Sequence, residues 1–190
     1  MRNYIINLDS RHDRWKSVAD EFNKRLLSYV RVPAVERRRG FEGCRMSHLA
    51  VLSEGKGLFG VFEDDVVFMN QPYYIDEAMS QLPKDWDCLY LGGNPQEEQS
   101  LYSENLFIAN NVLCTHAIIW NKRKGGAVNY ILHNQGKIRK IDEYLAKIIQ
   151  PQFNCFLIWP LVCIQSDSPS NVAGFSDVSQ IVTNYNKYCI

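Results

Sequence analysis

Three consecutive acidic residues, Glu63, Asp64 and Asp65, are the side chains of this sequence best suited to chemistry. They separate two apolar runs, at 58–62 and 66–68, where the chain is otherwise suited to burial. Carboxylates crowded at the edge of a core raise one another's pKa and resist desolvation unless a cation or several hydrogen-bond donors compensate. Ligation by oxygen alone suits Mn²⁺ or Mg²⁺ better than zinc. The triplet therefore predicts a divalent metal beside a phosphate group.

The spacing of the triplet suggests different roles for its members. Alternate residues of an extended segment point the same way, so Glu63 and Asp65 are expected to face the metal. Asp64 would then support the metal ligands or contact a ribose. The alternative is an acidic turn that is simply solvated, or one acid that caps the next element, and the apolar runs on both sides disfavour it.

The elements that must position the triplet alternate between apolar runs and amphipathic segments, which is typical of an α/β fold. Strands are expected at 4–8, 30–35, 58–62, 66–68 and 88–91, a hairpin or two strands over 106–120, and a strand-like run over 155–165. Helices are expected at 11–29, 43–54, 74–81, 124–133 and 142–149. No repeat, coiled coil or low-complexity tract appears, so residues 1–190 are expected to form a single domain.

Three segments carry more specific expectations. Asp9 and Ser10 offer side chains to cap the first helix, whose apolar face includes Leu26. The polar segment 95–104 has no periodicity and is expected to be a mobile loop near the site, as lids often are. The tail over 166–190 is expected to be loop-like.

Composition and charge exclude several classes of protein. Of the 190 residues, 46% are hydrophobic and 22% are charged, which fits one globular domain. The formal net charge is zero, so the field that draws proteins onto nucleic acid is missing and no nucleic-acid partner is expected. Cationic residues are concentrated at Arg31 and at the run 37–39. Such a run is more often a solvated loop than a binding patch, and as a patch it would suit phosphate.

Cysteine usage and hydropathy bear on the compartment. The six cysteines include no CxxC pair and lie mostly in apolar runs, as buried free thiols in a reducing compartment do. The first residues do not read as a signal peptide, and no apolar run reaches the roughly 20 residues needed to span a bilayer. A cytoplasmic protein without a membrane span is therefore expected.

Four segments in order, 4–14, 43–50, 62–66 and 141–145, together resemble glycosyltransferase family 25. The first is an Ile-Asn-Leu strand followed by arginine, the second begins Gly-Cys and holds a Ser-His pair, the third is Glu-Asp-Asp, and the fourth contains an acidic residue. The family includes bacterial lipopolysaccharide glycosyltransferases and the collagen galactosyltransferases of animals and giant viruses. The match extends to about Gln165 and is patchy between the segments.

The resemblance implies a GT-A-like, Rossmann-related fold with a mixed, mostly parallel sheet flanked by helices. The donor would be a UDP-sugar and the cofactor Mn²⁺, or Mg²⁺ in its place. A nucleotide-sugar half over about 1–93 would precede an acceptor half over about 94–165 and the tail over 166–190.

The resemblance also assigns residues to the donor pocket: Asn7, Leu8, Arg11, Arg14, Ser47, His48 and Asp64. Ligands of open α/β sheets bind at the carboxyl ends of the strands, so the first two would meet the base. Either arginine would reach the ribose or the diphosphate, with a solvated helix face as the alternative. The Ser-His pair would line the pocket, although a histidine within a helix often has a structural role instead.

The implied reaction moves a hexose, galactose or glucose by family expectation, to a saccharide, glycolipid or glycoprotein acceptor. The metal, held by Asp65 with Glu63 or Asp64, would bridge the diphosphate and stabilise the charge on the leaving nucleotide. Asp142 would remove the proton of the attacking hydroxyl in a displacement with inversion. The alternative role of Asp142 is an ordinary N-cap.

The sequence departs from the family pattern at two points. The spacer between the first two segments is short, with 36–41 in place of a longer stretch, so contacts with the acceptor can differ. Many GT-A enzymes complete the metal site with a late histidine, whereas the last histidine here is His133. Asp167, Gln165 or water would have to serve as the third ligand.

Two other classes of function fit the same residues. A metal-dependent phosphohydrolase or nucleotidyltransferase uses acid clusters with Mg²⁺ equally well. A non-catalytic domain of the same fold would bind a nucleotide sugar or a glycan without turnover. Hydrolysis of unglycosylated nucleotides would favour the first, and thermal stabilisation by ligand without turnover would favour the second.

Overall fold

The computed structural model describes residues 1–166, 169–170, 174–175 and 178–189. Its strands are β1 (Arg2–Asn7), β2 (Val30–Pro33), β3 (Gly57–Glu63), β4 (Val66–Phe68), β5 (Cys88–Tyr90), β6 (Asn94–Pro95), β7 (Ser100–Ser103), β8 (Leu106–Ile108), β9 (Val112–Leu113), β10 (Ala117–Lys122), β11 (Cys155–Ile158), β12 (Cys163–Gln165), β13 (Pro169–Ser170) and β14 (Gly174–Phe175). Its α-helices are α1 (His12–Lys24), α2 (Gly40–Glu54), α3 (Tyr73–Ser80), α4 (Ala127–His133), α5 (Ile141–Tyr144) and α6 (Val178–Tyr188). A 3₁₀ turn lies at Gln135–Lys137, and α5 continues as a π-helical segment over Leu145–Ile149.

An eight-stranded sheet in the order β2-β1-β3-β10-β5-β11-β8-β7 forms the centre of the structure. β1 pairs in parallel with both β2 and β3, and β5 pairs in parallel with β11. β10 and β8 are antiparallel to both of their neighbours, so the other six strands share one direction. The expected α/β fold, with a mixed and mostly parallel sheet flanked by helices, is confirmed.

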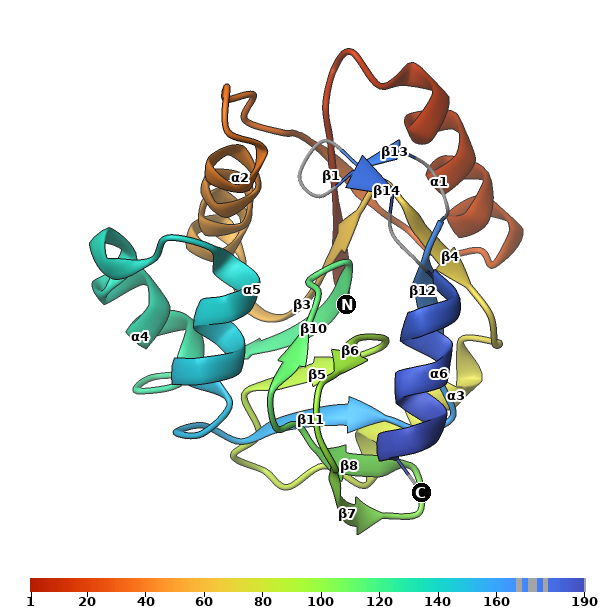
Figure 1. The fold of residues 1–190 in the computed structure, drawn as a ribbon, viewed down its shortest axis with the longest axis vertical. Coiled ribbons are helices and arrows are strands. Elements are labelled where there is room, and N and C mark those ends of the chain that lie inside the picture. The colour runs from red at the N-terminus through yellow and green to blue at the C-terminus, as the bar shows by residue number, and fades with distance from the viewer. Residues whose placement is uncertain (167–168, 171–173, 176–177, 190) are drawn as a thin grey trace.

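Helices cover both faces of this sheet, with α2, α4 and α5 gathered on one side and α1 on the other (Figure 1). The alternation of side chains along β1 explains the division. Tyr4 and Ile6 belong to the core that includes Val51 of α2, whereas Ile5 packs in the core that includes Phe22 of α1. The sequence of a strand that is buried on both faces is a continuous apolar run, which is why β1 could be predicted.

The first helix is shorter than predicted and lacks the predicted cap. α1 ends before residue 25, and the chain turns at Leu26, whose φ of 55° lies in the left-handed region. Leu26 is 94% exposed, so its assignment to the apolar helix face is wrong. The apolar spacing continues past the helix because Leu27 packs on the same core from the turn. Arg11 occupies the N-cap position and no side chain caps the helix, so neither Asp9 nor Ser10 has that role.

The segment 95–104 is not a loop beside the site. It contributes to β6 and β7, and β7 forms the edge of the main sheet at the end opposite β2. Gln99 is buried and donates hydrogen bonds to the carbonyl oxygens of Glu97 and Asn110. The prediction of a mobile lid is therefore wrong. It arose because an edge strand has exposed side chains, which gave the segment the composition of a loop.

The later strands differ from the predicted arrangement. The stretch 106–120 holds β8, β9 and the start of β10, and it is not a hairpin, because β8 pairs with β7 and β11 while β10 pairs with β3 and β5. The run 155–165 is divided into β11 and β12, with a cis bond between Trp159 and Pro160. The tail includes α6, with Ile181 and Tyr185 buried, so the loop-like prediction is wrong for that part.

The cysteines are free thiols, as predicted, and four of the six are buried, whereas Cys44 and Cys114 are partly exposed. Cys88 and Cys155 face each other in the β5–β11 pair, and burial raises the pKa of the Cys88 thiol well above its usual range. Neutral thiols in such positions act as small apolar core residues. The helices in the described part of the chain include none that is long and apolar enough to cross a membrane.

Candidate functional site

A cavity of about 390 Å³ opens where β1 and β3 end. The two strands are adjacent and parallel, so their carboxyl ends meet at one edge of the sheet. The predicted site residues that line the cavity are Leu8, Arg11, Arg14, Ser47, His48, Glu63, Asp64, Asp65, Asp142 and Gln165, the last a candidate third metal ligand. Asn7 is buried directly behind them, and Asp167 lies outside the described residues.

Asp64 is held by one side chain from β1 and one from α1. Asn7 Nδ2 donates to Asp64 Oδ2 at 2.7 Å, and Arg14 donates to Asp64 Oδ1 at 3.0 Å. Arg31 donates to Asn7 Oδ1 at 2.6 Å, so both polar ends of the Asn7 amide are engaged within the protein. Asn7 is only 1% exposed and does not line the cavity. It therefore positions Asp64 and is not placed to meet a base.

Asp65 is the less compensated of the two aspartates. Its side chain is 5% exposed, Arg14 approaches its Oδ2 at 3.4 Å, and its buried Oδ1 has no hydrogen-bond partner among the described residues. Burial raises the pKa of Asp65 to about 7, and the negative charge of Glu63 adds to the effect against the opposing charge of Arg14. A buried oxygen without a donor suits direct ligation of a cation. Asp65 thus fits the predicted metal.

Glu63 is turned toward α2. Its Oε1 lies 3.1 Å from His48 Nε2 and accepts a hydrogen bond from the Thr115 hydroxyl at 2.6 Å. Burial works to raise the pKa of Glu63, but the hydrogen bond and charge of His48 and the bond from Thr115 outweigh it and hold the pKa at about 2. Glu63 is therefore an ionised carboxylate with its own partners.

The alternate-face arrangement expected for the triplet is not what the structure shows. Asp64 and Asp65, not Glu63 and Asp65, share a partner, which is Arg14. The reason is local: β3 ends at Glu63, and the next two residues form a turn, so the extended alternation stops there. The triplet is one acidic cluster in sequence but two differently paired groups in space.

Ser47 has a structural role. Its hydroxyl donates to the carbonyl oxygen of Gly43 and accepts the backbone N–H of Val35, each at 2.8 Å, and the residue is 1% exposed. A Cβ at Gly43 would lie 2.3 Å from the Val35 carbonyl oxygen, so a glycine is needed for α2 to approach this closely. The Gly and Ser of the second motif therefore dock α2 on the segment that follows β2.

Basic side chains share the cavity with the carboxylates. Arg37, Arg38 and Lys140 line it together with Arg11. Arg11 pairs with Asp13 at 2.8 Å. The run 37–39 is an exposed loop, as expected, and two of its members also line the cavity. Guanidinium and ammonium groups at a cavity wall suit a phosphate-bearing ligand.

Asp142 lines the cavity from α5. Its Oδ1 accepts the backbone N–H of Glu143 at 2.8 Å, and the N-cap position of the helix belongs to Lys140, not to Asp142. The N-cap alternative for Asp142 is therefore wrong. A carboxylate that faces a cavity and has one oxygen bonded to backbone is oriented and can accept a proton with the other.

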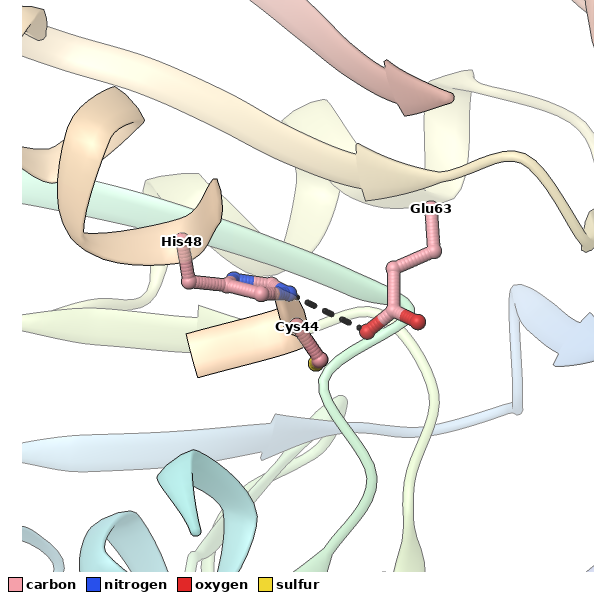
Figure 2. Close-up of side chains that lie close together, drawn as sticks. All are labelled: Cys44, His48 and Glu63. Atoms are coloured by element: carbon pink, nitrogen blue, oxygen red, sulfur yellow. Dashed lines mark hydrogen bonds and ion pairs between the residues drawn. The ribbon is translucent and has the colours of Figure 1, made fainter. Parts of the chain in front are cut away.

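A second group of possible metal ligands lies in the same cavity. Among the described His, Cys, Asp and Glu residues, Cys44, His48 and Glu63 form the one group of three whose ligand atoms all lie within 4.8 Å of one another. Figure 2 shows the three side chains converging from α2 and from the end of β3. The three carboxylates of the acidic triplet do not form such a group.

Several cavity residues had no signal in the sequence. Thr115, Cys114 and Lys140 line the site but were not singled out, and Cys44 was noted only as part of the Gly-Cys start of the second motif. Thr115 reaches Glu63 because β10 runs antiparallel to β3, and the carbonyl oxygen of the next residue, His116, accepts the backbone N–H of Glu63. Only the pairing of β10 with β3 could have revealed that Thr115 contacts Glu63.

No family model matches the sequence, and no curated protein matches it. Solved structures with a similar fold include A197 from STIV, which is 12% identical, with a TM-score of 0.48 over 82% of this chain and 80% of that one. The inositol-1-phosphate CTP transferase from T. maritima is 12% identical, with a TM-score of 0.46 over 98% of this chain and 77% of that one. The nucleoside-diphosphate-sugar pyrophosphorylase from Vibrio cholerae RC9 is 12% identical, with a TM-score of 0.36 over 83% and 72%. Similarities this low assign no activity to this chain.

Proposed function

We propose that the protein is a metal-dependent glycosyltransferase that moves a hexose from a UDP-sugar to a saccharide, glycolipid or glycoprotein acceptor. The observation that carries the proposal is the buried Asp65 carboxylate, whose Oδ1 has no donor among the described residues, in a cavity shared with cationic side chains. The carboxylate needs a cation and the cationic groups need an anion, and a metal with a diphosphate meets both needs. The four ordered motifs that resemble family 25 supply the sugar-transfer part.

The residues that would hold the metal are Asp65, whose Oδ1 has no donor among the described residues, and Asp64, which lies beside it on Arg14. Bound Mn²⁺ or Mg²⁺ supplies electrostatic stabilisation of the charge that develops on the leaving diphosphate. Asn7 keeps Asp64 in place through its amide. Glu63, which is bonded to His48 and Thr115, contributes less to this position than the sequence pattern suggested.

The remaining cavity residues divide between donor and acceptor. Leu8 offers an apolar surface to the base, and Arg11, Arg37 and Arg38 offer cationic groups to the phosphates. Asp142 would accept the proton of the attacking hydroxyl in a displacement with inversion at the anomeric carbon. The acceptor oxygen then forms the new glycosidic bond as the bond to the UDP oxygen breaks.

Release of UDP from UDP-galactose and UDP-glucose, measured with Mn²⁺ and a panel of saccharide and glycoprotein acceptors, tests the proposal. The wild-type protein should release UDP in step with formation of a glycosylated product. Asp65→Asn should lower the rate at least about 100-fold, as loss of a group that stabilises transition-state charge does. Asp20→Asn, an exposed acid of α1, is the matched control and should keep full activity.

Two results of this assay would contradict a glycosyltransferase. Hydrolysis of unglycosylated nucleotides without sugar transfer would indicate a phosphohydrolase or nucleotidyltransferase instead. Stabilisation by UDP-sugars with no turnover on any acceptor would indicate a binding domain.

A further inference from the structure

Cys44, His48 and Glu63 bring three different ligand types to one point of the cavity. Cys44 and His48 lie four residues apart on α2, so their side chains project from one face, and Glu63 meets them from the end of β3 (Figure 2). The thiol sulfur, a ring nitrogen and a carboxylate oxygen all lie within 4.8 Å of one another. His48 Nε2 and Glu63 Oε1 are 3.1 Å apart.

We propose that this group binds one zinc ion, with the sulfur of Cys44, Nε2 of His48 and a carboxylate oxygen of Glu63 as ligands. Zinc takes these three ligand types in proteins, at about 2.0–2.3 Å. On a tetrahedral ion such ligand atoms are roughly 3.3–3.6 Å from one another. The His48–Glu63 pair already has nearly this spacing, so small side-chain movements complete the site. The Cys44 thiol releases its proton to solvent as the sulfur takes the ion.

The zinc position differs in chemistry from the metal position proposed at Asp64 and Asp65. A thiolate and an imidazole select zinc and similar borderline cations, whereas a set of carboxylate oxygens selects Mn²⁺ or Mg²⁺. The two groups also have separate partners, since Arg14 bonds the aspartates while Thr115 bonds Glu63. Zinc binding therefore does not depend on the protein being a glycosyltransferase.

The fourth coordination position of the zinc ion would face the cavity, because all three ligand residues line it. Structural zinc sites are closed by four protein ligands, whereas a site with three keeps one position for water or another small ligand. The Thr115 hydroxyl, 2.6 Å from Glu63 Oε1, would keep the carboxylate oriented when the imidazole turns to the ion. The ion is thus expected to exchange and to be removed by chelators.

Cobalt(II) is the probe for this site, because it replaces zinc and absorbs in the near ultraviolet when a thiolate binds it. Protein freed of metal with a chelator should gain this absorption up to one Co²⁺ per chain and lose it when one equivalent of Zn²⁺ is added. Cys44→Ser should abolish the absorption. His48→Gln keeps the thiol and should weaken cobalt binding at least about 100-fold, since even outer-shell partners contribute 10–100-fold.

Two variants serve as controls. Cys114 is another partly exposed thiol of the same cavity, so Cys114→Ser should leave the cobalt absorption unchanged. Asp65→Asn should also leave it unchanged while removing Mn²⁺-dependent donor binding, which separates this site from the proposed function. Circular dichroism checks that each variant is folded. A folded wild-type protein without thiolate absorption, or an absorption that survives in Cys44→Ser, would overturn the zinc site.

Discussion

One arginine holds two carboxylates at the centre of the cavity. Arg14 donates to Asp64 at 3.0 Å and to Asp65 at 3.4 Å, and no side chain of the three is more than 11% exposed. Charges this buried persist only as a balanced group, because a charge left without its partner is poorly hydrated. A divalent cation beside Asp65 would offset the negative charge of the two carboxylates, as the arginine does.

Replacing Arg14 by methionine tests whether a metal can share the role of the arginine. Removal of one partner of a buried ion pair costs about 3–5 kcal/mol, so Arg14→Met should lower the free energy of unfolding by that order in the presence of a chelator. Added Mn²⁺ should recover part of the loss. Urea denaturation with chelator and with Mn²⁺ measures both quantities.

Arg25→Met is the comparison for this variant. Arg25 pairs with Glu21 and stacks over Phe68, away from the acidic triplet, so its loss should destabilise the protein without recovery by Mn²⁺. Equal recovery in the two variants would show that the metal effect is not specific to the Asp64–Asp65 pair.

The residues of the site differ in how far their roles could be predicted from the sequence. Asp64 and Asp65 could be predicted because carboxylates between apolar runs are costly unless they are functional or solvated. The roles of Glu63 and Thr115 could not be predicted, since they depend on where β3 ends and on its pairing with β10. Cys44 belongs to the Gly-Cys start of the second motif, but its place beside His48 and Glu63 could not be predicted, because it depends on how α2 packs against the end of β3.

Close backbone contacts between elements fix the walls of the site. Gly92 follows β5, and a Cβ there would lie 1.9 Å from the carbonyl oxygen of Cys163 in β12. The backbone N–H groups of Val162 and Cys163 both donate to the carbonyl oxygen of Leu91. β12 in turn pairs with β4, which follows the acidic turn. The contact at Gly92 thus supports the strand that comes directly after Asp65.

Gly92→Ala should destabilise the protein, because the added Cβ would meet the backbone carbonyl of Cys163, which cannot move aside as a side chain can. Overpacking costs about 1–3 kcal/mol, and a clash with a carbonyl belongs at the upper end. Gly136→Ala is the matched control, since nothing lies within 4 Å of a Cβ at that position. Urea denaturation should show a lower midpoint for the first variant and little change for the second. A Gly92→Ala protein as stable as the wild type would refute the close contact.

Element types could be predicted more fully than element pairing. β1 and β3 are short apolar runs, and α1 and α2 have apolar residues at helical spacing, so each was expected within a few residues of its place. β7 was missed because Leu101 and Tyr102 are exposed on an edge strand, which leaves no alternation of buried and exposed side chains. The end of α1 was missed because apolar residues beyond it return to the same core.

The zero net charge of the whole molecule conceals a local concentration of charge. The carboxylates of the acidic triplet and the cationic side chains of Arg37, Arg38 and Lys140 meet at one cavity. Net charge could be used to exclude a polyanionic partner but not a single diphosphate. The order of the strands could not be predicted from the sequence either. β10 lies between β3 and β5, so the predicted nucleotide and acceptor segments contribute to one sheet.

Removing the cationic pair should weaken nucleotide binding without unfolding the protein. Arg37→Ala combined with Arg38→Ala should lower the affinity for UDP with Mn²⁺ about tenfold or more, the effect of losing one charge-assisted hydrogen bond. Lys84→Ala removes an exposed charge that does not line the cavity and should have no effect. Titration calorimetry measures the affinities. Unchanged binding in the double variant would place the phosphates elsewhere.

The most direct test of the metal-dependent donor site is thermal unfolding of the wild-type protein and of Asp65→Asn with UDP-galactose or UDP-glucose, with and without Mn²⁺. The wild type should gain stability with sugar nucleotide and Mn²⁺ together, by about 2.7 kcal/mol when the donor is at 100 times its Kd. Either component alone should have a much smaller effect, and Asp65→Asn should gain nothing from the pair. Equal stabilisation of Asp65→Asn, or none in the wild type with either sugar nucleotide, would contradict a metal-dependent donor site at Asp65.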